Sequence, residues 1–208
     1  MAHGSCKNEK SVDSLEVVQP EVVDNAFKVT LNVTVKKDDT FSLYYTEDGS
    51  TDFTKSPPLW MVVKGNASQQ DVVFSLPQDV IPTQLRLDFG MNKDQEPIVI
   101  NSFQMNYFKN EFKIPGNQFF IYFDPDITKT IFDKTTATVS AVIKDGVRQS
   151  PSFYPNANPL GNEIKKGIEI AQFERGKKKP AVKVKYENIQ TLNRRVAVTA
   201  AKKLITVD

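Results

Sequence analysis

Apolar and polar residues alternate along residues 27–35, and this pattern is the clearest structural signal in the chain. The apolar positions are Phe27, Val29, Leu31, Val33 and Val35. The polar positions between them are Lys28, Thr30, Asn32 and Thr34. Successive side chains of a strand point to opposite faces of a sheet, so residues 27–35 are predicted to form a strand with one buried face and one solvated face.

Similar stretches, separated by turn residues, recur along most of the chain. They predict further strands over residues 41–46, 59–64, 71–76, 85–89, 98–107, 117–123 and 137–143, with an irregular first strand at 15–23. The apolar positions change parity within 98–107, which indicates a β-bulge near Asn101 and Ser102. No long amphipathic helix is expected in residues 16–150, and the residues 149–162, rich in Pro and Gly, are expected to be irregular. About nine short strands predict an all-β protein, an antiparallel sandwich of jelly-roll or immunoglobulin-like form.

The distribution of charge divides the chain into a mildly acidic body and a basic end. Ten of the 27 basic residues but only three of the 25 acidic residues lie in 172–208, which gives +7 there and −5 elsewhere. We therefore expect a cloning remnant and flexible tether at 1–15, a β-sandwich domain at 16–171, and a basic segment at 172–208. Within that segment, 180–186 reads as a strand, and 194–207 as either strands or a helix. The segment either completes the sandwich or forms a small appendage.

Histidine and cysteine usage restricts the chemistry that the chain can perform. The one histidine is His3, in the cloning remnant, so Ser-His-Asp or Cys-His catalysis and His-ligated metal sites are not expected. An enzyme would depend on carboxylates, Lys or Tyr, and no carboxylate pair stands out. The prediction is a protein that is not an enzyme. Nucleic-acid binding is not expected, because only Tyr186 is interleaved with the basic residues of the C-terminal segment.

Cys6 is the one cysteine, so it has no partner for a disulfide within the chain. A cysteine followed by a polar stretch resembles the start of a mature bacterial lipoprotein, and we take Cys6 as the lipidation site. The alternative is an incidental cysteine in a tail. The lipoprotein interpretation predicts an extracytoplasmic protein, lipid-anchored at the bacterial outer membrane or cell surface, or in the periplasm.

Three stretches in the middle of the chain resemble a known group of domains. They are residues 72–77, 85–90 and 98–103, followed by the aromatic run 119–123 and Asp124. Together, over about residues 25–145, the chain resembles galactose-binding-like β-sandwich domains of cell-surface proteins, notably from Bacteroidetes, which include carbohydrate-binding modules. The resemblance implies glycan binding, adhesion or a structural role, and such domains often carry a structural calcium ion.

Aromatic residues are candidate platforms for a sugar ring, whose C–H face is apolar. Tyr44 has the opposite parity to its apolar neighbours and should face solvent, and Tyr154 lies in a loop rich in Pro and Asn. Trp60 lies in the apolar run 59–63, which favours the core. Asn92 and Gln95 are candidate polar ligand-binding groups in a loop.

Acidic residues around Gly49 are the candidate metal ligands. Glu47, Asp48 and Asp52 offer the oxygen ligands that calcium prefers, although ordinary turn chemistry explains the same residues. No cofactor other than such a structural calcium is expected.

The function predicted from the sequence is an exported, non-catalytic surface lipoprotein whose sandwich binds a glycan. One alternative is a structural or assembly subunit of a cell-envelope complex, with a protein partner held by the basic segment and an edge strand. A second alternative is a carboxylate-dependent glycosidase.

Overall fold

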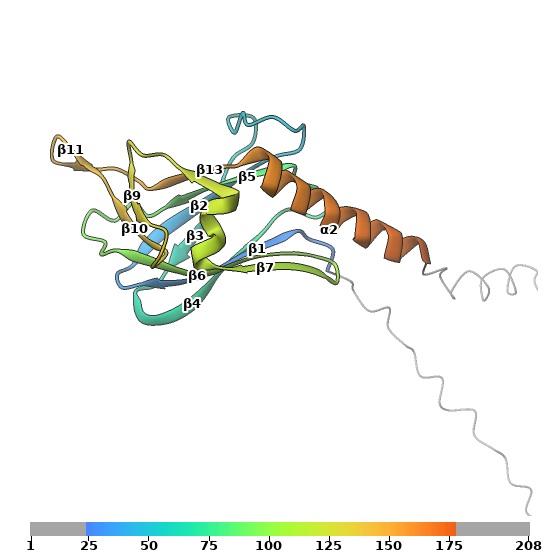
Figure 1. The fold of residues 1–208 in the computed structure, drawn as a ribbon, viewed down its shortest axis with the longest axis horizontal. Helices are drawn as coiled ribbons and strands as arrows, with labels where there is room; N and C mark the ends of the chain where they lie inside the picture. The colour runs from blue at the N-terminus through green and yellow to red at the C-terminus, as the bar shows by residue number, and fades with distance from the viewer. Residues whose placement is uncertain (1–23, 178–208) are drawn as a thin grey trace, which may run out of the picture.

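The computed structural model describes residues 24–177, and in this range two antiparallel sheets form a sandwich (Figure 1). The first sheet has the order β4-β1-β6-β10-β9, and β7 pairs with the other half of β6. Its strands are β1 (Lys28–Val35), β4 (Asn66–Ser75), β6 (Ile98–Tyr107), β7 (Asn110–Pro115), β9 (Thr130–Asp133) and β10 (Thr138–Ala141).

The second sheet has the order β3-β2-β5-β13-β8. Its strands are β2 (Asp39–Thr46), β3 (Leu59–Val63), β5 (Gln84–Phe89), β8 (Phe123–Pro125) and β13 (Ser152–Pro155). A separate hairpin pairs β11 (Ile143–Lys144) with β12 (Val147–Arg148). The prediction of an all-β antiparallel sandwich is confirmed, although the described residues form thirteen strands rather than about nine.

Strand β1 confirms the alternation that predicted it. Val29, Leu31, Val33 and Val35 are fully buried, and the residues between them are partly exposed. The β-bulge in β6 is also confirmed. Asn32 pairs with Ser102 and Val33 pairs with Ile100, so Asn101 is the extra residue.

The strand predicted at residues 117–123 is wrong. The chain forms a 3₁₀ turn, η1 (Gly116–Gln118), and one helical turn, α1 (Phe119–Tyr122), before β8 begins. A strand would bury alternate residues, whereas Phe119 and Phe120 are both buried and Ile121 is exposed. The helical turn places Phe119, Phe120 and Phe123 together on the core side. The sequence Phe-Phe-Ile-Tyr-Phe is apolar throughout, so it fits the period of a strand and the period of a helix equally well. Its pattern therefore could not distinguish the two structures.

Helix α2 (Ala157–Lys177) is the largest element that the sequence did not predict. Its first six residues fall in 149–162, which were expected to be irregular and which also contain β13. Leu160, Ile164 and Ala171 are buried on one side of the helix, which packs against β5, β6, β7 and α1. In Figure 1 the helix lies beside the two sheets and continues past them. It crosses residue 172, so the expected basic segment begins inside this helix.

Several predictions fall outside residues 24–177. They concern His3, Cys6, the first strand at 15–23, the strand at 180–186 and the alternatives for 194–207. In the part of the chain that the structure describes, no helix has the length and apolar character needed to cross a membrane.

Candidate ligand-binding groove

The outer face of the second sheet brings three large side chains side by side from three neighbouring strands. The core side of this sheet is formed by Leu85 and Leu87 of β5 and by the residues that pair with them on β2 and β13. The residues between these positions therefore point outward. Tyr44 on β2 pairs directly with Arg86 on β5. Tyr154 on β13 lies on the other side of Arg86, and the three residues form a row across the sheet.

The guanidinium of Arg86 lies between the rings of Tyr44 and Tyr154 and is hydrogen-bonded to Asp88. Its guanidinium carbon lies 4.7 Å from the ring centre of Tyr44 and 4.6 Å from that of Tyr154. Nε donates to Oδ1 of Asp88 at 3.0 Å and Nη2 donates to Oδ2 at 2.7 Å. Burial lowers the pKa of Arg86, but the hydrogen bonds and negative charge of Asp88 outweigh it, and the net pKa is raised. Arg86 is therefore a fixed cation whose charge Asp88 balances.

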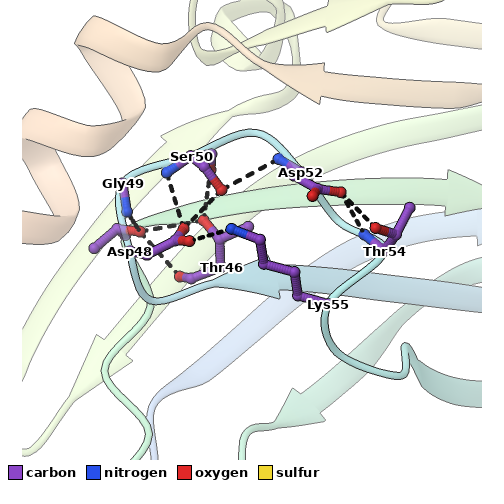
Figure 2. A network of polar contacts seen from close by, with 8 residues as sticks. Thr46, Asp48, Gly49, Ser50, Asp52, Thr54 and Lys55 are labelled. Carbon is purple, nitrogen blue, oxygen red and sulfur yellow. Dashed lines mark hydrogen bonds and ion pairs between the residues drawn. The ribbon is translucent and has the colours of Figure 1, made fainter.

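Residues 51–58 of the loop over residues 47–58 form the wall of the groove, and side-chain hydrogen bonds fix the first half of this loop (Figure 2). Asp48 accepts from the backbone N–H and the hydroxyl of Ser50, at 3.0 and 2.7 Å, and pairs with Lys55 Nζ at 2.5 Å. The hydroxyl of Thr46 donates to the carbonyl of Ser50, which ties the loop to the end of β2. This arrangement gives the wall a defined shape without a bound ligand.

The second half of the loop is anchored by one apolar side chain. Phe53 is 6% exposed, and its ring centre lies 6.4 Å from that of Tyr154. Next to it, the carboxylate of Asp52 accepts from the N–H and hydroxyl of Thr54, at 3.1 and 2.6 Å (Figure 2). Phe53 therefore holds the loop against the row of aromatic residues that forms the floor.

The groove between the row and the loop is open to solvent and has a volume of about 690 Å³, which is within the range typical of small-ligand sites. Its floor is formed by the row described above, and its wall by residues 51–58. It presents aromatic rings, a guanidinium and a few polar loop groups to solvent.

Trp60 faces the same side of the sheet as the groove. It pairs with Ser42, the outward residue of β2 that precedes Tyr44 by two positions. The expectation that Trp60 belongs to the core is wrong, because its side chain is 54% exposed. β3 is an edge strand whose Leu59 and Met61 pack against the core, which leaves the residue between them on the outer face.

Two predicted ligand-binding residues serve a different part of the structure. Asn92 donates from Nδ2 to the carbonyl of Asp38, and Gln95 donates from Nε2 to the carbonyl of Lys37 and to Oδ2 of Asp39. These amides close the loop between β5 and β6 onto the start of β2, and neither residue lines the groove.

The predicted calcium ligands lie in the groove loop, where Asp48 and Asp52 already accept several hydrogen bonds and Glu47 is exposed. Within residues 24–177, no three His, Cys, Asp or Glu side chains are grouped so that they could hold a metal ion. The calcium site stays a prediction.

Tyr44, Trp60 and Tyr154 were predicted separately, and the structure brings them to one face. Sequence reasoning missed Arg86, Asp88 and Phe53. Arg86 and Asp88 did show a signal, because they alternate with the buried leucines of β5, but charged residues on a wet face are common and did not single out a site. Phe53 lies in a polar loop with no periodic pattern around it.

Comparisons of the chain with protein-family models, with curated proteins and with solved structures give no match.

The loop over residues 47–58 is expected to keep its structure until the pH falls well below the ordinary pKa of an aspartate. The hydrogen bond from Lys55, with those from Ser50, lowers the pKa of Asp48 from 3.8. A lowered pKa means that this stabilisation is present above pH 3.8 and is lost as the pH falls through the folded-state value. The chemical shift of the Ser50 amide should therefore titrate below pH 3.8, and Lys55→Met should move the midpoint upward. A midpoint at or above 3.8 in the unmodified protein would contradict the network.

Proposed function

We propose that the protein is a non-catalytic glycan-binding protein and that the groove on the second sheet is its binding site. The observation that carries the proposal is the packing of Tyr44 and Tyr154 on Arg86, which pairs with Asp88, on the open outer face of the sheet that Trp60 shares. A sugar ring has an apolar C–H face that packs on aromatic rings. It also has hydroxyl groups that exchange hydrogen bonds with a guanidinium and a carboxylate.

Two further features support a binding role. The groove is fixed by contacts within the protein, so little ordering is needed when a ligand binds. It is also built on neighbouring strands of a rigid sheet, with one loop as a wall, which is a common arrangement for binding sites. The resemblance to galactose-binding-like domains in the sequence agrees with this proposal.

The test is a glycan array followed by calorimetry on the glycans that are retained. Tyr44→Ala should weaken binding by about tenfold or more, because Tyr44 lies in the floor of the groove and an aromatic residue at the centre of a binding site typically contributes over 1 kcal/mol. Ile131→Ala is the matched control, since Ile131 is 59% exposed but lies in β9 of the other sheet. Retention of no glycan at high protein concentration, or equal effects of the two variants, would reject the proposal.

We propose a second candidate, assembly with an envelope protein through the edge of β3. In the described part of the chain β3 pairs only with β2, and it exposes Trp60 and Val62 at 54% and 68%. An exposed apolar edge strand can be extended by a strand of a partner. Val62→Lys should remove a partner that co-purifies from native membranes, and a protein that always elutes alone would count against this candidate.

Export and lipidation of Cys6 remain predictions. The intact mass of the native protein tests them directly, because a diacylglycerol group on Cys6 adds a large and defined mass.

A further inference from the structure

Both cations of the groove are paired with a carboxylate of the protein itself. Lys55 pairs with Asp48, and Arg86 pairs with Asp88 through two hydrogen bonds. Asp52, whose carboxylate accepts from Thr54, is the other charged residue of the lining, whereas Asp48 and Asp88 pair with the two cations without lining the groove. Counted with these two partners, two cations and three anions give the region a formal charge of −1.

We propose that the groove selects uncharged glycans over acidic ones, an inference that rests on the glycan-binding function proposed above. Sites that bind carboxylate or phosphate groups offer an Arg or Lys whose charge is not already balanced. Here Arg86 has its carboxylate partner in place, and the side chains of Arg86 and Asp88 are only 18% and 13% exposed. An acidic sugar would have to displace Asp88 or approach it against its charge.

The rings on either side of Arg86 strengthen this selectivity. The guanidinium carbon lies 4.7 Å from the ring centre of Tyr44 and 4.6 Å from that of Tyr154. The two rings therefore keep the guanidinium in the orientation in which it bonds to Asp88. A guanidinium has five N–H donors, and Asp88 accepts two of the bonds. Three N–H donors are left to meet the oxygen of a neutral hydroxyl group, which binds without any need for charge compensation.

The affinity of the unmodified protein should depend on whether the sugar is neutral or acidic, and its affinity for a neutral sugar should depend little on salt concentration. A neutral oligosaccharide should bind at least about tenfold more tightly than the oligosaccharide of the same linkage that carries a uronic acid. Raising sodium chloride from about 50 mM to about 500 mM should change the affinity for the neutral sugar less than about twofold, because no ion pair forms with it.

The variant that tests the mechanism is Asp88→Asn. The amide keeps an oxygen to accept from Arg86 and keeps the size of the side chain, but it leaves the guanidinium charge unbalanced. The preference for the neutral sugar should fall about tenfold or reverse, and the binding of the acidic sugar should become sensitive to salt. Asp71→Asn is the matched control, because it removes the same charge on the first sheet, where Asp71 accepts from Asn32 at 2.7 Å.

The outcomes separate this inference from the proposed function. If the unmodified protein retains neither class of glycan, the proposed function fails. If it binds glycans but prefers acidic ones, or if salt weakens neutral binding tenfold, the glycan-binding function stands and the selectivity is overturned. A folded Asp88→Asn variant with unchanged preference also overturns it. If that variant does not fold, the preference and the salt dependence of the unmodified protein still decide the question.

Discussion

Replacing Phe119 by Ala is expected to destabilise the protein by about 3–5 kcal/mol, a large part of the stability of an ordinary domain. Phe119 is fully buried at the centre of the aromatic core. Its ring contacts those of Phe89, Phe103, Phe120, Phe123 and Phe153, at centroid distances of 4.6–6.3 Å. These rings come from both sheets, so truncation leaves a cavity that no single side chain can fill.

Ile121→Ala provides the control for Phe119→Ala. Ile121 belongs to the same helical turn but is 53% exposed, so its truncation should cost less than about 1 kcal/mol. Urea unfolding followed by tryptophan fluorescence and circular dichroism measures both variants. Equal effects would mean that the turn does not present Phe119 to the core. A strand at 117–123 would instead place residues 119 and 121 on the same face and make their costs similar.

The sequence predicted the fold class because alternation is strong wherever a strand has one buried and one solvated face. β1 is the clearest case, and the bulge in β6 could be located from the change of parity between Ile100 and Phe103. The pattern failed at several elements, and three of them show why. Residues 119–123 are apolar throughout, β7 has only two apolar positions, Phe112 and Ile114, and α2 begins among Pro and Gly residues, with only a narrow apolar side from Leu160 to Ala171.

The candidate site was predicted only in part, for a related reason. The alternation of apolar and polar residues placed Tyr44 on the outer face. It did not predict which residues of β2, β5 and β13 pair with one another, and this pairing decides whether Tyr44, Arg86 and Tyr154 form a row. Trp60 was assigned to the core because an apolar run on an edge strand looks like a buried strand in sequence. The wall of the groove depends on Phe53, whose burial results from long-range packing.

Gly90→Ala is the second substitution with a large expected effect, of about 3 kcal/mol or more. Gly90 has a φ of +78°, which costs any other residue about 1 kcal/mol, and an added Cβ would collide with the carboxylate of Asp39. Asp39 cannot move away easily. It is 6% exposed and accepts from the N–H groups of Met91 and Asn92, at 2.6 and 2.9 Å, and from Gln95. The substitution should therefore loosen the loop between β5 and β6.

Gly146→Ala separates the cost of the backbone conformation from the cost of the collision. Gly146 has a φ of +77°, and no atom beyond its two chain neighbours lies within 4 Å of the position that its Cβ would take. It should lose only about 1 kcal/mol, so the difference between the two variants measures the collision with Asp39. Equal losses in chemical denaturation would show that Asp39 can leave its position cheaply.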